Sequence, residues 1–137
     1  MRFLLLSIFI LLLKLGFTNT NNFIIKLDQF TLAKSQLSLN DTIEVTKQAW
    51  LTSDSLHLTA YICGANHSGE KASFIARGVN NLLFQDTYTN KGVAYTYSFS
   101  TQKINPENVR YVAMTIGAAA SENKMGWKYR MGTLKFI

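Results

Sequence analysis

Two runs decide the fold: Val-Ala-Tyr-Thr-Tyr-Ser-Phe-Ser at 93–100 and Val-Arg-Tyr-Val-Ala-Met-Thr-Ile at 109–116. In the first run an apolar or aromatic side chain occupies every second position from residue 93, which is the period of a half-buried strand. The second run is apolar on both faces, as a strand deeper in a core is. Between the runs, Asn105 is a suitable cap and Pro106 a suitable first residue for a single helical turn. We therefore expect two adjacent core strands joined by a compact crossover.

Period-two patterns recur along the rest of the chain. The clearest covers residues 55–63, where Leu56, Leu58 and Ile62 fall on one face. With the shorter runs, the sequence predicts about seven to nine short strands, the pattern of an all-β, antiparallel β-sandwich. The other predicted strands cover residues 22–27, 36–39, 42–51, 72–77 and 127–137, with loops at 64–70, 86–92 and 118–126, where a short helix at 118–122 is one option.

The first residues have the layout of a secretory signal peptide. Arg2 supplies a positive start, the run from Phe3 to Leu13 is apolar except for Ser7, and Lys14 ends it. A bilayer-spanning helix needs about 20 apolar residues, so this run is too short. We expect a signal peptide over residues 1–20 and a single domain over 21–137, secreted to the periplasm or the extracellular space without a stable membrane span. An uncleaved anchor is the alternative.

Charge and cysteine content narrow the choice of partners. Without Arg2 and Lys14, 12 of the 14 basic residues remain against 8 acidic ones. The only loose basic cluster has the spacing of a solvated strand face, which we prefer to a nucleic-acid or lipid surface, so no nucleic-acid partner is expected. The lone Cys63 forbids an internal disulfide and is expected to be a small buried side chain, with an intermolecular disulfide as the alternative. The basic cluster consists of Lys124, Lys128, Arg130 and Lys135.

Few residues suggest catalysis. His57 and His67 are the only histidines, and no cluster with metal-ligand spacing surrounds them, so we expect no metal and no cofactor. Six residues along a strand separate His57 from Cys63 by roughly 20 Å, too far for a nucleophile and its base. Because no phosphate-binding loop or nucleophile elbow is present either, an enzyme is the weaker interpretation. His67 would be the leading catalytic candidate in a small secreted hydrolase or toxin.

Aromatic side chains in loops and on polar strand faces are the candidate binding residues. Most aromatic residues of β domains belong to the core. Tyr88 in a polar loop and Tyr61 opposite the apolar face of its strand are the expected exposed ones. The candidate binding residues are Tyr61, His67, Tyr88 and Trp127. In a eukaryotic host, Asn40 and Asn66 would be glycosylation sites, since both begin an Asn-x-Ser/Thr sequence.

Three segments resemble the tellurium-resistance TerD family. They are Leu-Thr-Ala-Tyr-Ile-Cys-Gly-Ala-Asn at 58–66, Phe74-Ile75 followed by Asn80-Asn81-Leu82, and Ile-Asn-Pro-Glu-Asn-Val-Arg-Tyr-Val-Ala-Met-Thr-Ile at 104–116. The resemblance implies a β-sandwich of a family that binds calcium through acidic loops. The chain has Ser55-Leu56-His57 where that family has Asp-Leu-Asp, so calcium binding is not expected here.

A second resemblance implies the same architecture. Ile104, Pro106 and Tyr111 are similar to the Leu-x-Pro…Tyr corner of fibronectin type III and immunoglobulin-like domains, with the tyrosine one residue late. The function we expect is a secreted, non-catalytic binding or adhesion module for an extracellular protein or carbohydrate. The alternatives are a divergent TerD-like stress-response sandwich without a working calcium site, and a small secreted hydrolase or toxin.

Overall fold

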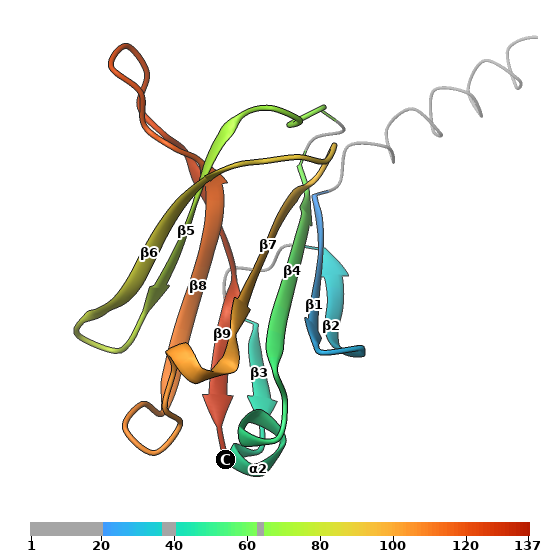
Figure 1. The fold of residues 1–137 in the computed structure, drawn as a ribbon, viewed down its shortest axis with the longest axis vertical. Coiled ribbons are helices and arrows are strands. Elements are labelled where there is room, and N and C mark those ends of the chain that lie inside the picture. Colours follow the sequence, from blue (N-terminus) through green and yellow to red (C-terminus); the bar gives the residue numbers. More distant parts are fainter. Residues whose placement is uncertain (1–20, 37–40, 63–64) are drawn as a thin grey trace, which may run out of the picture.

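The computed structural model describes residues 21–36, 41–62 and 65–137, which form two packed β-sheets (Figure 1). The predicted signal peptide, Asn40 and Cys63 lie outside the described residues, as does most of the strand predicted at 36–39. The predicted all-β sandwich is confirmed. The nine strands are β1 (Asn22–Leu27), β2 (Phe30–Gln36), β3 (Thr42–Val45), β4 (Ser55–Tyr61), β5 (Lys71–Arg77), β6 (Leu82–Thr89), β7 (Tyr95–Ser100), β8 (Tyr111–Ala118) and β9 (Lys128–Phe136).

The strands are divided between a four-stranded and a five-stranded sheet. The first has the order β2-β1-β4-β7 and the second the order β3-β9-β8-β5-β6. Every pairing is antiparallel except that of β3 with β9, which is parallel. Within the described residues, no helix is long and apolar enough to cross a bilayer.

The two strands predicted at 93–116 form, but they belong to different sheets. In β7, Tyr95 and Phe99 are buried while Thr96 and Ser98 are exposed, as the period-two pattern predicts. However, β7 is the edge of the four-stranded sheet and β8 an inner strand of the five-stranded one, so the expected adjacency is wrong. The connection carries the chain across the sandwich through the 3-10 helix η1 (Thr101–Lys103) and a turn capped by Asn105, whose Oδ1 accepts a hydrogen bond from the Glu107 amide.

The core is the space between the inward faces of the sheets. From the four-stranded sheet, Ile25, Leu56 and Leu58 are at most 1% exposed. From the five-stranded sheet, Phe74 lies in the same cluster and stacks on Tyr97 with ring centroids 4.5 Å apart. This burial of apolar area, at about 25 cal/mol per Å², is the main favourable contribution to folding in a domain without an internal disulfide. Other buried inward side chains of the five-stranded sheet are Val45, Ala72, Ala76, Val112, Met114, Ile116, Met131, Leu134 and Phe136.

The single strand predicted over 42–51 is wrong. The strand β3 ends at Val45, and the chain then forms the helix α2 (Lys47–Leu51), capped by Thr46, whose Oγ1 accepts a hydrogen bond from the Ala49 amide. Trp50 on this helix is 1% exposed and packs edge-on against Phe136. Its indole Nε1 donates to the carbonyl oxygens of Thr101 and Ile104, each at 3.0 Å, so α2 closes the end of the sandwich next to η1.

Two predicted loops also differ. The polar segment predicted as a loop from residue 86 continues β6 to Thr89, as an edge strand whose exposed side chains contact water. No helix forms at 118–122, where the chain makes a hairpin bridged between Ser121 and Lys124. At its base Gly117 is required, since a Cβ there would lie 2.3 Å from the Trp127 carbonyl oxygen.

Candidate binding site

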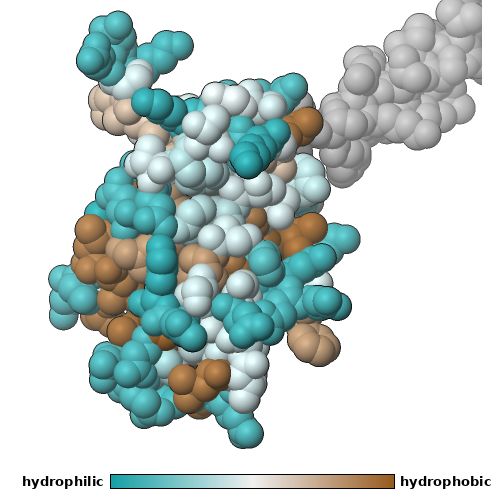
Figure 2. Space-filling view, in the orientation of Figure 1, coloured by the Kyte–Doolittle hydropathy of each residue, from teal (hydrophilic) through white to brown (hydrophobic). Residues whose placement is uncertain are grey.

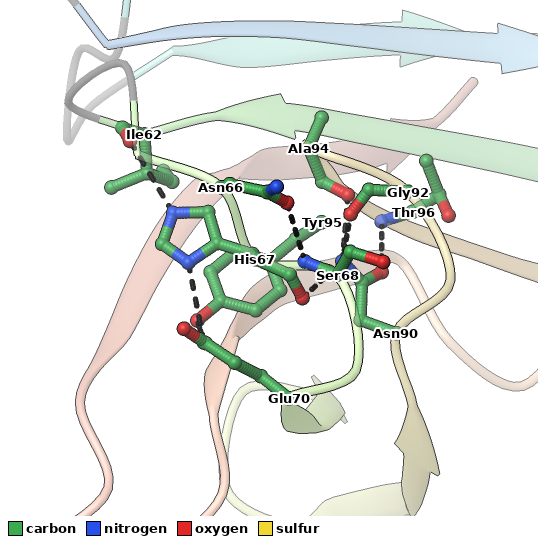
Figure 3. A network of polar contacts seen from close by, with 10 residues as sticks. All are labelled: Ile62, Asn66, His67, Ser68, Glu70, Asn90, Gly92, Ala94, Tyr95 and Thr96. Carbon is green, nitrogen blue, oxygen red and sulfur yellow. Dashed lines mark hydrogen bonds and ion pairs between the residues drawn. The ribbon is translucent and has the colours of Figure 1, made fainter.

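The candidate site lies at the end of the sandwich where the β4–β5 loop, the β6–β7 turn and the β8–β9 hairpin meet (Figures 1 and 3). His67 in the β4–β5 loop is its centre and is 4% exposed. Its ring stacks on Tyr95 with centroids 4.1 Å apart. Both ring nitrogens have partners, Nδ1 with Glu70 Oε2 at 3.2 Å and Nε2 with the Ile62 carbonyl oxygen at 3.3 Å. His67 is therefore fixed in position by its contacts.

Glu70 places a fixed negative charge beside this ring. The Tyr95 hydroxyl donates a hydrogen bond to Glu70 Oε2 at 2.5 Å, and that bond, with a smaller contribution from His67, holds the pKa of the Glu70 carboxyl below its ordinary value. Burial, reinforced by the same bond, raises the pKa of Tyr95. Because the Glu70 side chain is 44% exposed, its charge is available to a bound molecule.

Asn90 joins the loops that carry these residues. It is 1% exposed, and its Nδ2 donates to the carbonyl oxygens of His67, Gly92 and Ala94 at 2.8 to 3.1 Å (Figure 3). Its Oδ1 accepts a hydrogen bond from the Thr96 amide. An amide nitrogen has two hydrogens, so three acceptors around it mean that one bond is shared. One buried side chain thus holds the β4–β5 loop against the β6–β7 turn.

Trp127 completes the site from the start of β9. Its ring meets those of His67, Tyr95 and Tyr129 edge-to-face, with centroids 5.9, 5.8 and 5.0 Å away. The side chain is nevertheless 43% exposed. Such edge-to-face contacts are each worth about 0.5–1.5 kcal/mol, so this exposed indole has a defined orientation. We call His67, Glu70, Tyr95 and Trp127 the loop-end site.

Of the four predicted binding residues, the structure brings two together. His67 and Trp127 share the loop-end site, whereas Tyr61 is 50% exposed on the outward face of β4. Tyr88 was expected to be exposed in a loop, and this is wrong. It lies in β6, packs against the core and against Tyr97, and its buried hydroxyl has no hydrogen-bond partner within the part of the chain that the structure describes.

Of the two predicted glycosylation sites, the structure describes one. Asn66 is exposed in the β4–β5 loop, and its Oδ1 accepts a hydrogen bond from the Ser68 amide at 3.0 Å. Its glycosylation stays a prediction, and Asn40 lies outside the described residues.

Sequence reasoning missed Glu70, Asn90 and Tyr95 as parts of the site. The sequence predicts Tyr95 as one of the alternating aromatic positions of a strand and Asn90 as part of the loop at 86–92. The contacts that bring Asn90 and Tyr95 into the site span 23 to 28 positions of the chain, which no local spacing reveals, whereas Glu70 lies three positions after His67.

The described residues include no group of three or more His, Cys, Asp or Glu side chains that could hold a metal ion. No protein-family model matches the chain, and a search of curated proteins also finds no match. The function must therefore be argued from the site.

Proposed function

We propose that the protein is a secreted, non-catalytic binding or adhesion module that contacts an extracellular protein or carbohydrate through the loop-end site. The observation that carries this proposal is the half-exposed indole of Trp127, held edge-on by three neighbouring rings. A rigid aromatic ring loses little conformational freedom on binding, and Trp is enriched among the residues that dominate interface energies. Glu70 beside it offers an ionised acceptor for hydroxyl or amide donors.

The surroundings of His67 support binding rather than hydrolysis. A general base needs a ring nitrogen within hydrogen-bond reach of the group that it deprotonates. Here Nδ1 faces Glu70 and Nε2 faces a carbonyl oxygen. The hydroxyl closest in sequence, that of Ser68, donates to the Lys91 carbonyl oxygen instead. This arrangement suits a structural histidine that supports Trp127.

The strand order supports the same function by analogy. The orders β1-β4-β7 and β9-β8-β5-β6 correspond to strands A-B-E and G-F-C-C′ of immunoglobulin-like sandwiches. In that correspondence His67 lies in the B–C loop and Trp127 in the F–G hairpin. Antibody variable domains use these two loops to contact their ligands. A shared fold is only an analogy for function, so the argument rests on the site itself.

A glycan array with the secreted protein tests the carbohydrate version of the proposal. We expect signals that Trp127→Ala abolishes and that Met125→Ala retains, because Met125 is 93% exposed in the same hairpin and has none of the ring contacts of Trp127. A blank array would reject a carbohydrate partner. Cross-linking to extracellular proteins, compared between the same two variants, then tests the protein version. Loss of binding in both variants, or in neither, would contradict the role of Trp127.

Secretion has its own test. N-terminal sequencing of the exported protein should find a new N-terminus between Thr18 and Asn21. An exported protein that still begins at Met1 would contradict cleavage and favour the anchor.

A further inference from the structure

The net charge of the domain is concentrated on the outward face of the five-stranded sheet. The alternation of β5, and that of β9 on either side of its bulge between Arg130 and Gly132, directs five cations away from the core. Among the described residues, Glu44 of β3 pairs with Lys135 at 2.7 Å, and Glu122 of the β8–β9 hairpin lines a pocket together with Lys71 at one end of the face. Residues 21–137 otherwise contain seven basic and seven acidic residues, counting Arg110, which lies over Tyr111 at one end of this face, so the excess of positive charge in residues 21–137 equals that of the face. We call it the basic face, and its cations are Lys71 and Arg77 on β5 and Lys128, Arg130 and Lys135 on β9.

These cations flank an uncharged strip. The strand β8 lies between β9 and β5, and its outward residues Ala113, Thr115 and Gly117 are small. Thr115 pairs with Arg130 on one side and with Ile75 on the other. Two strand spacings separate β9 from β5, so the two columns of cations stand roughly 10 Å apart, on either side of β8.

The base of the strip contains an unpaired polar group. Ser73 on β5 points away from the core, because its neighbour Phe74 points into it. Ser73 is nevertheless 2% exposed, since the exposed Thr87 stands beside it on β6 and the backbone of β8 at Gly117 on its other side. Its hydroxyl has no hydrogen-bond partner among the described residues. A buried hydroxyl without a partner carries a free-energy cost, which an outside acceptor could relieve only if the side chains that cover Ser73 moved aside.

We propose that the basic face binds a linear anionic polysaccharide, carboxylated or sulfated, that runs along β8 between the two columns of cations. Its charge complements the face, and repeated charges along a chain suit cations that repeat along strands. The basic face is separate from the loop-end site, because Trp127 turns inward to His67 while Lys128 lies on the outward face.

The face fits other polyanions less well. Single-stranded nucleic acids are held by exposed aromatic rings on which bases stack, and the face carries only Tyr111, half-buried at one end beside Arg110. A membrane-binding surface needs exposed large apolar side chains. Val79 and Leu82 are exposed, but they lie at the β5–β6 turn and not along β8. Figure 2 shows hydrophobic residues gathered on the left side of the molecule.

The test measures the affinity of the secreted protein for immobilised heparin, a sulfated chain, and for polygalacturonate, a carboxylated one, with neutral dextran as the blank. We expect at least one anionic chain to bind, and its Kd to rise with salt. Replacing two cations, Arg77→Gln with Arg130→Gln, should weaken binding about tenfold and lower the slope of log Kd against log salt by about two.

A matched variant distinguishes binding by the basic face from an effect of the protein's net charge alone. Lys26→Gln with Lys34→Gln removes the same charge from exposed positions of β1 and β2 in the other sheet, and should leave Kd unchanged within about twofold. Equal weakening by both double variants would overturn the proposal, as would binding to neither chain. Tighter binding to single-stranded DNA or to vesicles of phosphatidylcholine and phosphatidylglycerol would assign the face to those partners instead. Trp127→Ala should leave the heparin affinity unchanged, which keeps this test independent of the loop-end site.

Discussion

Asn90 is the residue on which the loop end most depends. Replacing it with alanine leaves the carbonyl oxygens of His67, Gly92 and Ala94 and the Thr96 amide without this partner in a buried place. We expect Asn90→Ala to lower the free energy of unfolding by about 2 to 4 kcal/mol, measured by urea denaturation. Asn123→Ala, at an exposed position of the β8–β9 hairpin, should change it by less than about 0.5 kcal/mol. Equal effects would contradict the role of Asn90.

Glu70 should make stability depend on pH. Its folded pKa lies below the ordinary 4.5, so the stabilisation is fully present above pH 4.5 and is lost as the pH falls through the folded pKa. We expect the free energy of unfolding to fall less steeply below pH 4.5 in Glu70→Gln than in the wild type. The exposed Glu122→Gln serves as the control and should follow the wild-type curve. Parallel curves for Glu70→Gln and the wild type would contradict this prediction.

The helix α2 is the element that most departs from its sequence pattern, and its cap offers a direct test. Thr46→Ala removes the acceptor of the Ala49 amide and should cost about 1 kcal/mol of stability by thermal or urea denaturation. Thr46→Ser keeps the hydroxyl and should retain most of the stability that Thr46→Ala loses. An equal loss in both variants would mean that the threonine methyl group, rather than the cap, supports the helix.

Strands with one buried face could be predicted, whereas elements defined by distant partners could not. The pattern of β4 and β7 follows from alternation alone, because each has one face in the core. Trp50 instead belongs to a helix because its indole reaches carbonyl oxygens 51 and 54 positions away. The sequence predicts a loop over residues 86–89 of the edge strand β6 because the exposed face of that strand is polar, and because Asp86, which pairs with Tyr97 and Lys103, is also a typical turn residue.

Two residues of the candidate site could be predicted from their type and local sequence, but the arrangement of the site in space could not. The sequence indicates His67 as a candidate because it is a histidine in a polar loop, and Trp127 because it is an aromatic residue at the start of a predicted strand. Their contact, and the part of Glu70 and Tyr95 in it, arises only when two loops and a hairpin meet at one end of the sandwich.

For the molecule as a whole, stability should not depend on reducing agents. The chain has a single cysteine, so no internal disulfide can contribute to it. The urea midpoint should be the same with and without dithiothreitol, at protein concentrations where size-exclusion chromatography shows a monomer. A lower midpoint in the reductant, together with a dimer band on a non-reducing gel, would instead show that an intermolecular bridge contributes.

The parallel pairing of β3 with β9 has a consequence for how the chain reaches this structure. Glu44 and Lys135, which meet across that pair, are 91 positions apart. When the polypeptide is synthesised or exported from its N-terminus, β3 emerges with its backbone donors and acceptors unmatched, and it must wait until nearly all the later strands have emerged. The hairpins β5–β6 and β8–β9 join neighbours in the chain and can form early, whereas closing so long a loop is slow. During that interval β3 is the segment most open to a wrong partner, and a chaperone bound to the emerging chain would protect it best there.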